Sequence, residues 1–243
     1  MRYGIIADIH GNLEALEAAI ADLETRGVDR WICTGDIVGY GANPSECLAR
    51  VRDLDAATVA GNHDWAVCGK LDIAYFNAYA REAVEWTRAQ LSDSEISYLT
   101  QLPLTYDVTD VLTVAHSTLY RPDTFEYLLT AYDASISMRM MEVPLLVVGH
   151  SHVPVTFLLD YRDQVAFTFE PRIEVKKYKR TILNTGSVGQ PRDDNPDAAF
   201  GHYDTETGFA EVIRLPYDVD TASGKIRAAG LPEILAERLH VGK

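Results

Sequence analysis

Side chains of the types that bind divalent metal ions occur in five short clusters along the first 152 residues. Seven of them are candidate ligands: Asp8, His10, Asp36, Asn62, His116, His150 and His152. The clusters contain five of the chain's seven histidines, and most follow a short apolar run typical of a β-strand. Because side chains at strand ends are held rigidly, distant segments can converge on one point. The spacing therefore predicts a metal site.

Taken singly, each cluster can be explained without a metal ion. Asp8 and His10 could be a solvated polar pair, Gly35-Asp36 an ordinary turn, and His116 a core histidine bonded to a backbone carbonyl. The runs 61–64 (Gly-Asn-His-Asp) and 149–152 (Gly-His-Ser-His) favour metal ligation even in isolation, since each places several ligand groups just past an apolar strand. Together, five clusters in this order favour one shared site.

The ligand types indicate which ions bind and what they do. Imidazole and carboxylate groups without thiolates favour manganese, iron, zinc, cobalt or nickel. Two ions need about eight ligating interactions, which seven residues can supply if one carboxylate bridges. Two ions roughly 3.5–4 Å apart can activate a bridging water and clamp a phosphoryl oxygen. We therefore expect two divalent metal ions and the hydrolysis of phosphoric esters.

The elements that must position these residues alternate in the first third of the chain. Apolar runs at 3–7, 30–34 and 58–60 indicate strands. Between them, Asn12 can cap a helix with one apolar stripe, and Pro44 can open another. This order predicts a parallel sheet covered by helices.

Strands and helices also alternate in the middle of the chain. A helix is expected over 73–91, a second after the capping box of Ser92 and Glu95, and a third over 133–141. The expected strands there are 105–108, 111–115 and 145–148.

The final third reads as consecutive strands. They are 155–161, 165–170, 181–184, 199–203 and 210–215, and they predict a second, largely antiparallel sheet. Helices are expected from Val219 and from Pro232. The predicted fold class is α/β, with two packed sheets flanked by helices in a single domain over residues 1–243.

Composition limits the partners and the compartment. The chain of 243 residues has 22 basic and 36 acidic side chains, a formal net charge of -14. This balance disfavours nucleic acid and suits a small phosphorylated substrate. The three cysteines lack the spacing of a metal site or a disulfide framework. An immediate strand leaves no room for a signal peptide, and no apolar stretch approaches the roughly 20 residues of a membrane span. We expect a cytoplasmic protein; the sequence does not determine its oligomeric state.

Taken together, the five clusters resemble the motifs of the calcineurin-like metallophosphoesterase family. The run 184–190 (Asn-Thr-Gly-Ser-Val-Gly-Gln) also resembles a downstream family segment, although Thr185 stands where relatives often carry proline. Gly39-Tyr40-Gly41 and 186–189 are most similar to the small bacterial and archaeal phosphodiesterase branch. The resemblance implies a four-layer sandwich of two mixed β-sheets with helices outside, and a dinuclear metal centre at the upper edge of the sheets.

The resemblance also implies roles for individual residues. One ion would be held by Asp8, His10, Asp36 and His152, and the other by Asp36, Asn62, His116 and His150. Asp36 would bridge the two ions, and a metal-bridging hydroxide would attack the phosphorus. His63, with Asn62, would contact the substrate, and His63 would protonate the leaving oxygen or stabilise the transition state. Asp64 would orient the His63 ring.

Several residues have two open interpretations. Arg192 could contact a phosphate oxygen or form a salt bridge with Asp193 or Asp194. Tyr40 and Tyr120 could line a pocket or belong to the core.

Other functions also remain compatible with the sequence. On the same scaffold, a protein Ser/Thr phosphatase or a dinucleoside-polyphosphate hydrolase is an alternative to a phosphodiesterase or phosphomonoesterase. A non-enzymatic metal-binding interaction module and a nuclease are less favoured.

Overall fold

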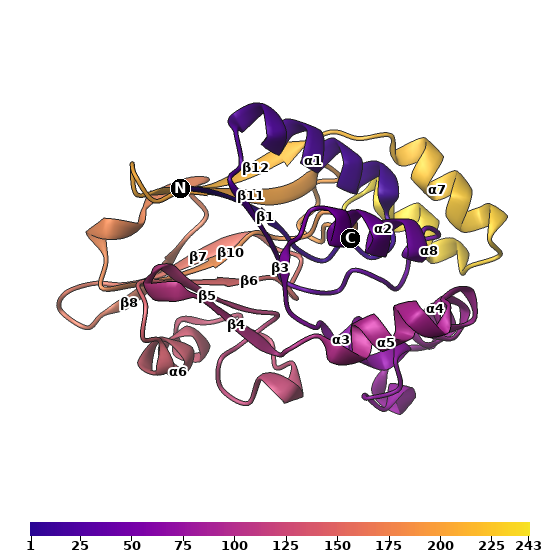
Figure 1. Ribbon diagram of the computed structural model, residues 1–243, viewed down its shortest axis with the longest axis horizontal. Helices are drawn as coiled ribbons and strands as arrows, with labels where there is room; N and C mark the ends of the chain where they lie inside the picture. The colour runs from indigo at the N-terminus through magenta and orange to yellow at the C-terminus, as the bar shows by residue number, and fades with distance from the viewer.

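Two six-stranded β-sheets pack face to face, with helices on their outer sides (Figure 1). The computed structural model describes residues 1–243, apart from the side chain of Thr109. The first sheet has the order β3 (Ala57–Thr58), β2 (Arg30–Cys33), β1 (Arg2–Ile6), β11 (Ala198–Asp204), β12 (Phe209–Leu215) and β9 (Arg172–Glu174). The second has the order β4 (Thr105–Val108), β5 (Leu112–Ala115), β6 (Leu145–Val148), β10 (Arg180–Asn184), β7 (Val155–Leu159) and β8 (Val165–Thr168). This architecture confirms the predicted α/β class.

Both sheets are mixed, as the resemblance implied, but the late strands do not form the largely antiparallel second sheet that their pattern predicted. In the first sheet β1, β2 and β3 run parallel while β11 pairs antiparallel with β1. In the second, β5, β6 and β10 are parallel and β7 is antiparallel to β10. The late strands therefore do not form a sheet of their own, because they are divided between the two sheets. The alternation of apolar and polar residues predicts a strand, but it does not show which neighbouring strand it pairs with.

The buried apolar residues form four clusters, two of which pack on opposite faces of the second sheet. Ile5, Val114 and Val147 are fully buried between the two sheets. On β6 the neighbouring Leu146 and Val148 point the other way, into the layer beneath α6 (Ala131–Met140). Burial of both faces explains why the strands that lead to the site are continuous apolar runs.

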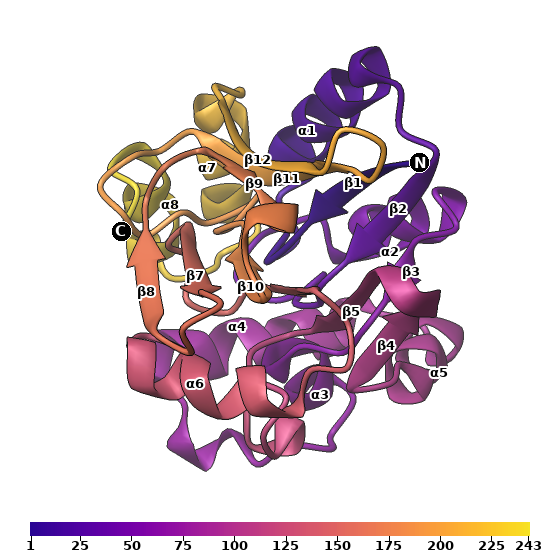
Figure 2. The same cartoon turned by 90° about the vertical axis from the view of Figure 1, so that its left-hand side faces the viewer.

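Local signals place the helices that flank the sheets. Asn12 accepts a hydrogen bond from Ala15 N at the start of α1 (Leu13–Arg26), and Gly27 ends it in the left-handed region with a φ of 77°. The other helices are α2 (Pro44–Asp53), α3 (Asn62–Val67), α4 (Ala78–Gln90), α5 (Asp93–Gln101), α7 (Val219–Ala228) and α8 (Glu233–Glu237). The last two begin close to the predicted positions. Figure 2 shows α1 and α7 beside the first sheet and α6 beside the second.

One predicted helix is in fact two elements. The expected helix over 73–91 is a short 3-10 turn, Ile73–Tyr75, followed by α4. Asn77 lies between them and caps α4, because its side chain accepts a hydrogen bond from Ala80 N. Within the described chain, none of the helices has the length and apolar character needed to cross a bilayer.

Candidate metal centre

The predicted ligands lie together at one edge of the sandwich, where parallel strands end. Asp8 and His10 follow β1, Asp36 follows β2, and Asn62 begins α3 just after β3. From the second sheet, His116 follows β5, while His150 and His152 follow β6. Carboxyl ends of parallel strands meet at one edge of a sheet, and packing the two sheets brings both sets of ends together.

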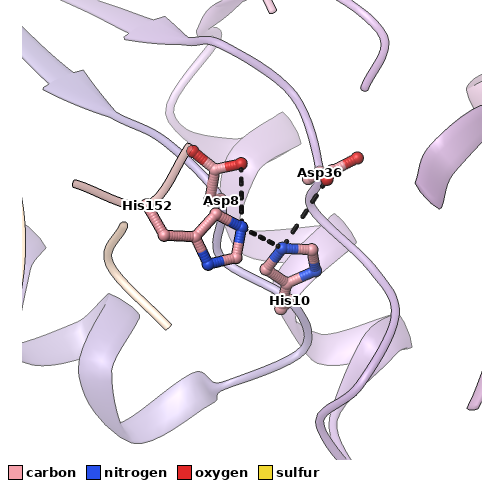
Figure 3. A group of neighbouring side chains, drawn as sticks. All are labelled: Asp8, His10, Asp36 and His152. Atoms are coloured by element: carbon pink, nitrogen blue, oxygen red, sulfur yellow. Dashed lines mark hydrogen bonds and ion pairs between the residues drawn. The ribbon is translucent and has the colours of Figure 1, made fainter. Parts of the chain in front are cut away.

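One group of ligands consists of Asp8, His10, Asp36 and His152, shown in Figure 3. The Nε2 atoms of His10 and His152 are 3.1 Å apart. His152 Nε2 lies 3.5 Å from Asp8 Oδ1, and His10 Nε2 lies 3.6 Å from Asp36 Oδ2. Donors about 2.1 Å from one ion lie roughly 3–3.5 Å from one another, so these four atoms have the spacing of a coordination shell.

A second group shares Asp36 and adds His116 and His150. His116 Nε2 is 3.4 Å from Asp36 Oδ2 and 3.1 Å from His150 Nδ1. Asn62 Oδ1 is 3.2 Å from the same His116 nitrogen. The structure therefore brings all seven predicted ligands into two adjoining groups, with Asp36 Oδ2 between them.

The tautomers of His10 and His152 favour a cation between their Nε2 atoms. His10 Nδ1 lies 3.2 Å from Val38 O and His152 Nδ1 lies 2.6 Å from Gln190 O. A carbonyl oxygen only accepts, so each Nδ1 carries the proton and each Nε2 is left as a lone pair. Two lone pairs that face each other across 3.1 Å repel unless a cation lies between them. Such carbonyl contacts are also the usual support of metal-binding histidines.

The pKa shifts of the buried Asp8, Asp36 and His116 also indicate that the cluster favours a positive charge. Burial raises the pKa of Asp8 to about 7. Burial would also raise the pKa of Asp36, but His116 and His63 hold it well below its usual value. Burial would lower the pKa of His116, yet the Asp36 carboxylate outweighs it and raises that pKa to about 9. The buried carboxylates thus draw a positive charge to the centre of the cluster.

Backbone strain accompanies the cluster. Five of the seven ligands have a positive φ: Asp8, His10, Asp36, His150 and His152, with values between 50° and 68°. This region costs an ordinary residue energy and is occupied only where the surroundings impose it. All five residues lie within four residues of the end of a strand.

The segment 184–190, which resembles a family segment, hydrogen-bonds to the end of the strand that carries Asp8. Val188 N donates to Ala7 O at 2.8 Å, and Gly189 N donates to Asp8 O at 3.0 Å. A Cβ on Gly189 would lie 1.8 Å from Ile9 O, so only glycine permits this approach. Thr185 N donates to Val148 O at 3.3 Å, a bond that proline at this position could not form.

Asp64 has a different role from the predicted one. Its carboxylate accepts backbone N–H groups of Asp36, Ile37, Val38 and Gly61 at 2.8–3.3 Å. His63 Nδ1 is buried and has no hydrogen-bond partner in the part of the chain that the structure describes. The carboxylate therefore fixes the loop that carries Asp36 and does not orient the His63 ring. Because Asp64 directly follows His63 in the sequence, the motif alone could not show whether its carboxylate bonds to the His63 ring or to the loop that carries Asp36.

The His63 ring is held by aromatic contacts. It lies against Tyr40, with centroids 4.4 Å apart, and against Phe76 at 5.1 Å. Burial lowers the pKa of His63 to about 4. His63, Asn62 and Tyr40 all line a cavity of about 420 Å³ that opens from the cluster. Tyr127 also lines it, a residue that sequence reasoning passed over because no local motif marks it.

The alternative salt bridges of Arg192 do not form. Asp193 pairs with Arg214, and Asp194 lies 3.4 Å from Lys243 Nζ. Arg192 instead lines the cavity, with its Nη2 donating to Gln190 Oε1 at 2.9 Å. Its buried Nε has no partner among the groups that the structure describes.

The comparisons with known proteins agree with the fold and establish the family. Residues 1–208 match the calcineurin-like phosphoesterase superfamily domain, and the chain belongs to this family. An uncharacterised protein of Methanocaldococcus jannaschii is 37% identical over 242 residues, which are 98% of this chain and 97% of the relative.

Two solved structures share the whole fold. A metallophosphoesterase from Sphaerobacter thermophilus is 37% identical with a TM-score of 0.88, and the match covers 100% of both chains. A hypothetical protein from Pyrococcus horikoshii is 20% identical with a TM-score of 0.80 over 100% of this chain and 98% of that one, which supports the fold alone. The predicted family and four-layer fold are therefore confirmed.

Replacement of Asp36 by asparagine tests the shared ligand. We expect Asp36→Asn to lower the metal content of the purified protein to less than about half, because both groups of donors lose the same carboxylate. Elemental analysis after equilibration with Mn²⁺ measures this. Asp53→Asn, an exposed carboxylate at the end of α2, is the matched control. Unchanged metal content in Asp36→Asn would contradict a shared site.

Replacement of Asp64 by alanine tests its structural role. Four buried N–H groups would lose a charged acceptor, so we expect the free energy of unfolding to fall by about 3 kcal/mol or more. Denaturant unfolding of the metal-free protein measures the change, with Asp53→Ala as the control. If Asp64 only served His63, the variant would lose activity while its stability stayed unchanged.

Proposed function

We propose that the protein hydrolyses phosphodiester or phosphomonoester bonds with the help of two divalent metal ions. Membership of the phosphoesterase family supports hydrolysis of phosphoric esters. The observation that carries the two-ion proposal is the pair of donor groups that share Asp36. The ligand types fit manganese, iron, zinc, cobalt or nickel. Ions bound there would supply an activated water and neutralise charge on the phosphoryl oxygens.

The position of His63 in the cavity supports a role at the leaving group. It lines the cavity beside Asp36, and its ring packs between Tyr40 and Phe76. We assign to it the stabilisation of the transition state or the protonation of the leaving oxygen, with Asn62 beside it as a further substrate contact. Proton donation requires that the negative charge of a bound phosphate raise the pKa of His63 from about 4.

Arg192 is the proposed contact for a non-bridging phosphate oxygen. Its neighbour Gln190 holds one end of the guanidinium, and the buried Nε has no hydrogen-bond partner among the described residues. Its centre lies 5.7 Å from the centroid of Tyr40, which fixes its position at the cavity wall. Guanidinium groups bind phosphate oxygens through parallel N–H bonds, which suits this placement.

A small substrate fits the site best. The cavity of about 420 Å³ lies within the usual range for small-molecule sites. The net charge of -14 opposes binding of a long polyanion, so a nucleic acid is disfavoured. We also propose a cytoplasmic location, because Cys33 and Cys47 are buried free thiols, as is usual in a reducing compartment.

Metal-dependent hydrolysis of a substrate panel tests the function. The panel contains an aryl phosphomonoester, an aryl phosphodiester, a dinucleoside polyphosphate and a phosphopeptide. We expect Mn²⁺-loaded protein to hydrolyse at least one aryl ester, and EDTA-treated protein and Asp36→Asn to hydrolyse none. The relative rates decide between monoester and diester. Absence of turnover on every substrate with each of the five metals would refute the proposal and favour an interaction module.

The role of His63 has its own test. We expect His63→Ala to retain its metal content while its turnover falls by about 10²–10⁴-fold, the range for loss of an acid catalyst. Steady-state kinetics and elemental analysis are measured on the same preparation. His202→Ala is the matched control, because this histidine lies on β11, away from the cavity. Full activity of His63→Ala would remove the assigned role.

A further inference from the structure

Aromatic side chains form two walls beyond the ligands. The floor of the cavity is made by residues of the metal centre, including Asp36, His150 and His152. One wall comes from 71–77, between α3 and α4, and the other from 124–127, between β5 and α6. Each wall contributes two aromatic rings: Tyr75 and Phe76 on one, Phe125 and Tyr127 on the other.

The first wall presents Tyr75 to solvent at the cavity rim. The Tyr75 side chain is 93% exposed, although it lines the cavity. The turn that carries it is fixed at both ends, because Asp72 Oδ1 accepts from Ala74 N and Asn77 Oδ1 accepts from Ala80 N, each at 2.9 Å. Phe76 anchors the turn against the His63 ring. The exposed ring is thus held on a fixed turn.

The second wall is fixed directly to the metal centre. Phe125 has a φ of 50° and packs edge-on against His116, with centroids 5.8 Å apart, and against Trp65 at 5.4 Å. Tyr127 stacks on His150 with centroids 4.2 Å apart and an interplanar angle of 22°. About half of Tyr127 nevertheless remains exposed, at 51%. One face of this ring is used for packing and the rest faces outward.

Exposed tyrosines on both walls of one cavity call for a planar apolar ligand. An exposed aromatic ring adds little to stability, whereas a rigid ring beside a phosphate site can stack on a base or another flat group. The floor offers metal ligands and the rim offers flat apolar surfaces. A phosphoester whose alcohol carries a planar ring matches both ends of the cavity.

We propose that Tyr75 and Tyr127 bind the planar ring of a single nucleoside phosphoester while its phosphate lies on the metal centre. This inference rests on the proposed hydrolase function and adds the substrate class. Stacking tolerates any base, so the subsite selects for a ring and not for one nucleobase. A long nucleic acid is still opposed by the net charge of -14.

Two ligands that differ only in the base test this proposal. They are the phosphonate analogues of adenosine 5′-monophosphate and ribose 5-phosphate, in which a CH₂ group replaces the ester oxygen and prevents hydrolysis. Calorimetric titration of Mn²⁺-loaded protein gives both dissociation constants. We expect the nucleotide analogue to bind about tenfold more tightly, the factor that one stacked base of ordinary strength provides.

Substitutions at Tyr75 locate the effect, because this residue touches none of the predicted ligands in the contacts described. Tyr75→Leu should weaken the nucleotide analogue by about fivefold or more and leave the ribose analogue unchanged, while Tyr75→Phe keeps the ring and the affinity. Tyr161→Leu is the control, since Tyr161 is 71% exposed on the turn between β7 and β8.

Three outcomes would overturn the inference. Equal affinities of the two analogues would remove the base subsite, and the hydrolase proposal would stand if the aryl esters were still cleaved. Equal weakening of both analogues in Tyr75→Leu would indicate a general disturbance and not stacking. Binding of neither analogue, together with no hydrolysis of any phosphoester, would overturn the inference and the proposed function together.

Discussion

The site depends on buried acceptors that face one another across about 3 Å. Backbone carbonyls accept hydrogen bonds from the Nδ1–H groups of His10 and His152, so both Nε2 lone pairs point inward. Asp36 Oδ2 adds negative charge at the same point. This arrangement is unfavourable without a positive charge in its centre, and the rest of the fold must hold it in place. Two packed sheets achieve this because both end their parallel strands at one edge.

The loops after those strands have strained backbone conformations, which bring the candidate ligands together. Five ligands have left-handed backbone conformations, and such strain persists only where neighbouring contacts impose it. Asp64 supplies part of that support, since its buried carboxylate collects the N–H groups of the Asp36 loop. The segment 184–190 supplies more by crossing between the sheets and bonding to Ala7 and Asp8. Contacts with these residues thus hold the candidate ligands in their strained backbone conformations.

The sequence predicted the convergence of the candidate ligands better than the residues that support them. Asp8, His10 and the other ligands lie in local motifs after apolar runs, and chemical type and spacing are visible there. The division of late strands between two sheets was invisible, because β10 and β11 follow each other closely yet pair with β6 and β1. The carbonyls that fix the histidines and the stacking of Tyr127 on His150 arise from tertiary packing alone. Asp64 was misassigned because adjacency in sequence does not reveal which way a side chain points.

The same packing links His63 to the rim of the cavity. A Cβ on Gly39 would lie 2.7 Å from His63 Nδ1, so glycine leaves no side chain there to bond the ring. The ring is positioned instead by Tyr40 and Phe76. Phe76 directly follows Tyr75, on the turn held by Asp72 and Asn77. If the two proposals hold, a ligand stacked on Tyr75 would also stabilise the turn that positions His63, so that binding of the ring and the proposed role of His63 would depend on one short segment.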